Sequence, residues 1–178
     1  KNAAKNAMAN FADVGKITFT ETSDGTNANI AWASLDNEDS YGALGWAVTP
    51  EWESYAGITT VNRDFYKDQL DEGIIDPGSF YYITFEHELG HALGLKHPHD
   101  SDTYQAFPGV SSASDLGDND LNATPWTLMT YNDVNVNEYS PSSYTKSGYL
   151  TGLGALDIAA IQYLYGANNN TRKENNIY

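Results

Sequence analysis

The chemistry-bearing residues of this sequence gather in one stretch, residues 85–98, which reads FEHELGHALGLKHP. Three of the four histidines in 178 residues fall inside it, and the fourth, His99, follows directly. His87 and His91 are four positions apart, so on a helix both rings project from one face and can bind the same metal ion. Two imidazoles leave a tetrahedral metal one protein ligand short.

The residues around this pair supply what is missing. Glu88 is rotated by about 100° from His87 on a helix, so it can act on water at the metal without binding the metal. Gly94 can take a left-handed backbone and end the helix, which lets His97 reach the same ion. By composition, the pattern H-E-x-x-H-x-x-G-x-x-H has a chance on the order of 1 in 100,000 of arising. We therefore predict zinc held by His87, His91 and His97, with an open fourth position.

Three further residues could belong to this site. His99 lies two residues past the last proposed ligand, and we expect an exposed loop residue rather than a fourth ligand. Met129 stands in the apolar stretch TLMTY, where a lone methionine is usually a core residue, but beside a long zinc motif it indicates the methionine-containing turn below the metal. Tyr131 would then bring a phenol near zinc, either as a fifth ligand or as a donor to a developing oxyanion.

Turn and cap signals indicate which elements position these residues. Small and apolar side chains at helical spacing predict a helix over residues 3–14, and Ser79 is a candidate N-cap for a helix over residues 80–95 that carries the histidines. A terminal helix is predicted over residues 150–165, with Leu153, Leu156, Ala160, Ile161 and Leu164 packed on one face. Short strands are predicted over residues 16–20, 28–32, 44–48 and 57–61.

The composition excludes several classes of partner. With 24 acidic and 9 basic residues the net charge is −15, which repels phosphate backbones and anionic membranes, so we expect neither nucleic acid nor membrane as a partner. The chain has no cysteine, and no stretch approaches the roughly 18 apolar residues of a membrane span. The acidic residues lack a calcium-loop pattern and are interpreted as a solvated surface. We expect one domain, and a monomer.

Taken together, these residues resemble the metzincin metalloproteases, and more narrowly the serralysin family of secreted bacterial zinc endopeptidases. Pro98 follows the zinc motif as in serralysins, and Met129 and Tyr131 match the Met-x-Tyr of serralysins and astacins. Residues 11–21, 77–79 and 157–168 also resemble family sequence, so the resemblance spans nearly the whole chain.

The resemblance implies an α+β fold with a twisted mixed sheet, an active-site helix and a C-terminal helical subdomain. It implies one catalytic domain over residues 1–178, with an upper subdomain to residue 97 and a lower one from residue 98. The same zinc ligands follow, with Glu88 as the base, Met129 as a hydrophobic floor and Tyr131 as a mobile phenol. Residues 44–48 resemble the edge strand along which an extended substrate pairs.

The sequence also departs from the family pattern. It opens inside the first helix, where the family has a preceding strand, and it stops before the calcium-binding β-roll, so a Ca²⁺ site is expected only beyond this chain. Residues 100–125 do not follow the usual continuation after the third histidine. The implied function is a secreted, extracellular endopeptidase acting on proteins or peptides. The alternative is a catalytically silent zinc-binding module of a larger secreted protein; a structural zinc site is disfavoured because such sites usually have four protein ligands.

Overall fold

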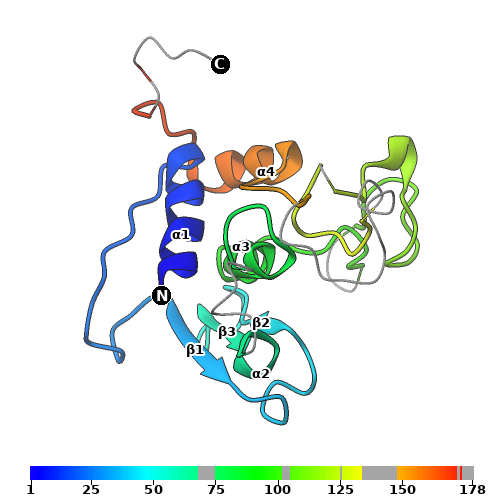
Figure 1. Ribbon diagram of the computed structural model, residues 1–178. Coiled ribbons are helices and arrows are strands. Elements are labelled where there is room, and N and C mark those ends of the chain that lie inside the picture. Colours follow the sequence, from blue (N-terminus) through cyan, green and yellow to red (C-terminus); the bar gives the residue numbers. More distant parts are fainter. Residues whose placement is uncertain (68–74, 102–104, 125, 134–147, 172, 174–178) are drawn as a thin grey trace.

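The computed structural model describes residues 1–67, 75–101, 105–124, 126–133, 148–171 and 173. In chain order the elements are α1 (Asn2–Val14), β1 (Ala31–Leu35), β2 (Gly45–Ala47), β3 (Ile58–Asn62), α2 (Arg63–Tyr66), α3 (Phe80–Ala92), the 3-10 turn η1 (Asp118–Asp120) and α4 (Ala155–Tyr165). Figure 1 shows α3 at the centre, with the sheet below it, α4 above it and α1 beside it.

The described strands form one mixed sheet in the order β1-β3-β2. β1 is parallel to β3, with Ala31 opposite Ile58, and β2 is antiparallel to β3, with Gly45 opposite Val61. The predicted α+β class and mixed sheet are therefore confirmed, and three of the four predicted strands overlap the observed ones. β2 lies at an edge of this sheet and packs against α3.

The strand predicted over residues 16–20 is wrong. Lys16 donates its backbone N–H to Gly166 O at 2.8 Å, but the segment joins no strand among the described residues. Burial nevertheless alternates along it, with Ile17 and Phe19 packed against the core and their neighbours exposed. Alternation of apolar and polar side chains indicates which face of a segment is buried. It does not show that a neighbouring strand is present to form hydrogen bonds with that segment.

The central helix α3 begins where the sequence predicts. The Ser79 side chain accepts a hydrogen bond from Tyr82 N at 3.3 Å, which satisfies one N–H of the first turn. On its sheet side Phe85 lies 5.5 Å from Trp32, measured between ring centroids. Leu89 is fully buried. Because most of its residues are buried, α3 is a core helix, and its polar side chains must find partners inside the protein.

A polar contact joins α1 to α3. Asn10 of α1 donates to Glu86 Oε1 at 2.5 Å, and its Nδ2 also lies 3.2 Å from the Tyr82 hydroxyl and 3.2 Å from Thr151 O. Glu86 is fully buried, and this burial raises the pKa of its carboxyl to about 7. The amide of Asn10 therefore fixes α1 against α3 and against the segment that leads into α4.

The terminal helix is shorter and less buried than predicted. α4 begins at Ala155, and its buried line consists of Asp157 and Ile161. Leu164 is 50% exposed, which contradicts its predicted place in the packed face. Only one residue is buried in each turn of α4, and one of these two buried residues is the carboxylate Asp157. Apolar spacing alone does not reveal so narrow a contact.

The segment after α4 returns to the end of α1. Asn168 N donates to Val14 O at 2.9 Å, and its side chain donates to Ala12 O at 2.6 Å. Thr171 Oγ1 donates to Asp13 O at 2.7 Å. Within the described part of the chain, no helix is long and apolar enough to cross a membrane. The division into subdomains at residue 97 stays a prediction.

Candidate metal centre

α3 carries His87 and His91 one turn apart and ends in a turn that reverses the chain. Gly94 has a φ of 101°, its N–H donates to His91 O at 2.9 Å, and Leu95 N donates to Gly90 O at 2.9 Å. This pair of bonds is the Schellman motif, which needs a residue that tolerates positive φ. The predicted role of the glycine as helix stop is confirmed, and the turn brings the third histidine back towards the first two.

The three motif histidines converge on one point. The Nε2 atoms of His87, His91 and His97 are 3.1, 3.1 and 3.2 Å apart, and these residues form a group that could hold a metal ion. Tetrahedral zinc bound at 2.0–2.1 Å requires nitrogen atoms about 3.3–3.4 Å apart. The observed triangle is close to that size, so these residues fit a zinc ion.

The first two imidazoles are oriented by backbone carbonyls. Nδ1 of His87 lies 2.8 Å from Leu128 O, and Nδ1 of His91 lies 2.9 Å from Leu95 O. A carbonyl oxygen can only accept a hydrogen bond, so each Nδ1 carries the proton and each Nε2 presents a lone pair. Leu95 belongs to the reversing turn itself, which therefore both ends α3 and orients one of its histidines.

The third imidazole is oriented by a side chain. Nδ1 of His97 lies 3.2 and 3.3 Å from the two carboxylate oxygens of Asp100, and Asp100 also accepts the His97 backbone N–H at 3.0 Å. The carboxylate thus fixes the same tautomer as the carbonyls do for the other two rings. The Asp100 side chain is 36% exposed, so this partner is reached by solvent.

Burial keeps the three rings neutral. Burial, and next the neighbouring imidazoles, lower the pKa of His87, His91 and His97 to about 4 in each case. Three lone pairs held 3.1–3.2 Å apart repel one another unless a cation lies between them. Neutral imidazoles with converging lone pairs are the form in which histidine binds a metal.

Glu88 follows His87 in α3 and lies against Gly45 at the start of β2. Its side chain is 6% exposed, and burial raises the pKa of its carboxyl to about 8. A Cβ added at Gly45 would lie 2.9 Å from Glu88 Cγ and 2.6 Å from Thr60 O, so only glycine fits at this point of the strand. A cation held by the imidazoles would favour the carboxylate form of Glu88.

Met129 packs beneath the histidine helix, as predicted. Its side chain is 2% exposed, and a Cβ added at Gly90 would lie 2.8 Å from its sulfur. The glycine within α3 therefore permits the close approach of the methionine turn. A glycine inside a helical pattern was the sequence signal for such an approach.

Tyr131 reaches the triangle from the solvent side. Its hydroxyl lies 2.9 Å from Nε2 of His97, and the residue is 60% exposed. Because Nδ1 of His97 carries the proton, the phenol donates to the lone pair of Nε2. Burial, and then the charges of Glu88 and Asp100, raise the pKa of the phenol, so it remains a donor at neutral pH.

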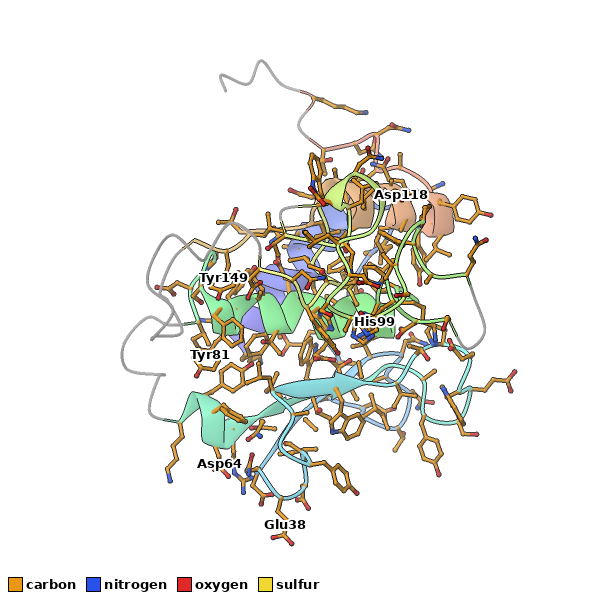
Figure 2. All side chains as sticks on the ribbon, turned by 90° about the vertical axis from the view of Figure 1, so that its right-hand side faces the viewer. Glu38, Asp64, Tyr81, His99, Asp118 and Tyr149 are labelled. Carbon is orange, nitrogen blue, oxygen red and sulfur yellow. The ribbon has the colours of Figure 1, made fainter. Side chains whose placement is uncertain are left out.

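His99 differs from the exposed loop residue that the sequence predicts. Its ring stacks on His97 at 5.0 Å between centroids and an angle of 18°, and it lies 5.2 Å from the ring of Tyr131. Figure 2 shows His99 at the end of α3 opposite to Tyr81. His99 stands in the turn that Asp100 N closes by donating to His97 O at 3.1 Å, and Pro98 in the same turn is buried. His99 is therefore a half-buried residue that packs against both the third imidazole and Tyr131.

The methionine turn is held by residues that sequence analysis did not single out. Asp157 of α4 accepts hydrogen bonds from Thr127 Oγ1 at 2.6 Å, Leu128 N at 2.7 Å and Gly154 N at 2.9 Å. Leu128 in turn orients His87 through its carbonyl. At the other end of the turn, Thr130 Oγ1 donates to Asn122 Oδ1 at 2.8 Å. The contacts of Asp157 with Thr127 and Leu128 span 30 and 29 residues, which no local pattern reveals.

This chain is similar in sequence to a known protein family and to several known proteins. The sequence model of metallo-peptidase family M12 matches residues 1–140. The chain is 33% identical over 192 residues to a serralysin of Photorhabdus laumondii, which covers 100% of this chain and 35% of that protein. It is 34% identical over 181 residues to serralysin C of Dickeya chrysanthemi, covering 98% of this chain and 35% of that protein.

A more distant relative aligns over a similar length. A serralysin of Proteus mirabilis is 28% identical over 188 residues, covering 100% of this chain and 36% of that protein. The chain therefore spans about a third of the length of the relatives it matches.

Proposed function

Because the chain belongs to metallopeptidase family M12 and is a serralysin-type metzincin domain, we propose that it hydrolyses peptide bonds as a zinc endopeptidase. The observation that carries this proposal is the convergence of three neutral imidazole nitrogens, 3.1–3.2 Å apart, beside a buried glutamate. A site with three protein ligands leaves a position for water and substrate.

His87, His91 and His97 hold the zinc in this proposal. Bound zinc supplies a Lewis acid that polarises the substrate carbonyl and makes water more acidic. The partners of the three Nδ1 atoms keep the lone pairs of Nε2 directed at one point, which lowers the cost of assembling the ligand set. The near match between the observed triangle and zinc geometry supports this assignment.

Glu88 acts as the general base. Its carboxylate takes a proton from the attacking water and afterwards gives it to the leaving amine. The burial of Glu88 supports this role, because a carboxylate with a raised pKa is a stronger base than an exposed one.

Tyr131 acts as a donor to the oxyanion that develops on the substrate carbonyl. The hydroxyl already lies on the side of His97 that faces the other imidazoles, 2.9 Å from its Nε2. The three imidazoles and one open position satisfy zinc, and a phenol with a raised pKa is a reluctant anion but a good donor.

The substrates we propose are proteins or peptides in extended form, which pair with the exposed edge of β2. We further propose that the whole protein is secreted and acts outside a bacterial cell as a monomer, with no nucleic acid or membrane as partner. The charge of −15 supports the absence of polyanionic partners.

Cleavage of casein by the zinc-loaded chain tests the proposal. Wild-type protein should retain one zinc per chain after dialysis and cleave casein. The Glu88→Gln variant should retain zinc while its turnover falls by roughly 100- to 10,000-fold, the usual contribution of a general base. His91→Ala should lose the zinc. A chain that holds zinc but cleaves neither casein nor a peptide library is instead a silent zinc-binding module.

A further inference from the structure

Along β2, residues whose backbone groups face β3 alternate with residues whose backbone groups face the opposite edge of the strand. Leu44 O and both backbone groups of Val48 bond to the main chain at either end of β3, and both backbone groups of Trp46 bond to a threonine hydroxyl of β3. Because these residues face β3, alternation directs the backbone groups of Gly45 and Ala47 towards the opposite edge. No strand in the described part of the chain pairs with that edge.

The two ends of β2 lie at different distances from the proposed base. The start of the strand lies directly over Glu88, since a Cβ added at Gly45 would be 2.9 Å from its Cγ. A strand advances about 3.3 Å per residue, so Ala47 and Val48 lie roughly 7–10 Å further along the edge. A peptide cleaved beside Glu88 therefore passes these residues with a part of its chain that lies away from the cleaved bond.

An apolar hollow begins where β2 ends. Ala47, Val48, Thr49, Trp52 and Tyr55 line a space of about 350 Å³. The two aromatic residues are 67% and 65% exposed, and both line the hollow from the loop that continues the strand. Large exposed aromatic side chains beside a hollow of this size are typical of a binding site for an apolar group.

The loop that carries the aromatic residues is held in place before any ligand arrives. Tyr55 N and Ala56 N both donate to Trp52 O, at 2.8 and 3.0 Å, and Trp52 N donates to Thr49 O at 3.1 Å. Glu51 forms an ion pair with Lys96, which belongs to the turn that follows α3. The groove is therefore attached both to the edge strand and to the turn that carries the third imidazole.

We propose that this groove, lined by Trp52 and Tyr55, takes one bulky apolar side chain of the substrate, two to four residues before the cleaved bond. This inference rests on the proposed peptidase function and adds a specificity determinant to it. A peptide that pairs antiparallel to β2, the more stable pairing per residue, runs in the opposite direction to the strand. Its residues before the cleaved bond therefore pass Ala47 and Val48, and those after it pass Leu44.

Paired peptides measure this preference directly. One internally quenched peptide carries phenylalanine at the second, third or fourth position before its cleaved bond, and its partner carries alanine there. With the zinc-loaded wild-type chain, kcat/KM should be about 10- to 100-fold higher for one phenylalanine peptide than for its alanine partner, as a filled apolar subsite allows. In Trp52→Ala and Tyr55→Ala that ratio should fall towards one, whereas Tyr163→Ala, which removes a still more exposed tyrosine on α4, should leave it unchanged.

A binding measurement separates the groove from the chemistry. The zinc-loaded Glu88→Gln chain should bind the phenylalanine peptide more tightly than its partner by the same factor, and adding Trp52→Ala should remove the difference. Cleavage without any preference at these positions overturns the groove and leaves the peptidase function standing. If the wild-type protein binds the phenylalanine peptide selectively but does not cleave it, the groove stands and the peptidase function is overturned. A preference confined to positions after the cleaved bond, or for arginine over phenylalanine, also overturns the proposal.

Discussion

His87 and His91 differ from His97 in what holds them. The first two belong to a buried helix, and their Nδ1 atoms donate to backbone carbonyls 2.8 and 2.9 Å away. The third stands on the turn after the helix, and its Nδ1 lies 3.2–3.3 Å from the partly exposed carboxylate of Asp100. A helix fixes two rings at once, but a ring on a turn needs a partner of its own.

This difference indicates where the site is rigid and where it can be tuned. A carbonyl partner cannot be removed by substitution, but the peptide group of Leu128 is held by the buried side chain of Asp157, which can be replaced. A carboxylate partner can be replaced without disturbing the backbone. We therefore expect changes on the helix side to affect folding and metal binding together, and changes on the turn side to affect metal binding alone.

Asp157→Ala should have the largest effect, because it removes the anchor on the helix side. Three hydrogen-bond donors lose the buried carboxylate that accepts from them. This loss should lower the free energy of unfolding by about 3–5 kcal/mol and the zinc affinity by about 10- to 100-fold. Urea unfolding of the zinc-free chain and competition with a chromophoric chelator measure the two quantities. Glu38→Ala, an exposed acidic residue at the far end of the molecule in Figure 2, is the control. An unchanged unfolding midpoint would contradict the anchor role.

Tyr131→Phe tests the residue that approaches the turn-borne imidazole. Loss of one donor in the transition state should lower the turnover number by roughly 10- to 1,000-fold, about 1.4–4 kcal/mol, while zinc content and substrate affinity stay the same. Steady-state kinetics and elemental analysis distinguish the roles. Loss of zinc, or a change in KM alone, would mean that the phenol is a ligand or a binding group instead.

Asp100→Asn should weaken zinc binding without unfolding the protein. The amide oxygen still accepts the Nδ1 proton but without charge, so we expect about tenfold lower zinc affinity and faster zinc release, with an unfolding midpoint close to that of wild type. Chelator competition on the folded chain gives the affinity. If the midpoint falls as far as in Asp157→Ala, the two sides of the site are not distinct.

Gly94→Ala tests the turn that joins the two sides and should have the smallest effect. Its φ of 101° is strained for alanine, whereas a Cβ there would meet nothing closer than 3.7 Å, so backbone strain alone should cost about 1–2 kcal/mol of unfolding free energy. Gly25→Ala, where a Cβ meets nothing within 4 Å, is the matched control. Equal midpoints for the two variants would contradict this account.

The sequence predicted the local parts of this site well. The histidine spacing, Ser79 as N-cap and Gly94 as stop all act within a few residues, so periodicity and cap chemistry suffice to place them. Asp100 stands three residues after His97, and a carboxylate at that spacing was a usable signal. Leu128 offered no such sequence signal, because every residue has a backbone carbonyl and only the tertiary fold determines which carbonyl accepts from the His87 ring.

The remaining differences between the sequence-based predictions and the structure arise from contacts between distant parts of the chain. Residues 16–20 have strand periodicity but no strand partner in the described part, and Leu164 has an apolar side chain on a helix that buries only a narrow line. Asp157 was interpreted as part of a family-like stretch, and its hydrogen bonds to a turn 29 and 30 residues earlier came only from the structure. Propensity describes a segment, whereas burial depends on what the segment meets.

The return of the chain to the end of α1 has a consequence for the order of folding. Asn168 and Thr171 bond to Ala12 and Asp13 across separations of 156 and 158 residues. A ribosome releases the first helix long before these partners, so α1 cannot complete its native contacts until residues 168–171 have been synthesised. Loops of this length also make folding slow, because their closure entropy is lost before the contacts form. Any pathway that handles the chain before residue 168 has emerged therefore meets α1 without these contacts.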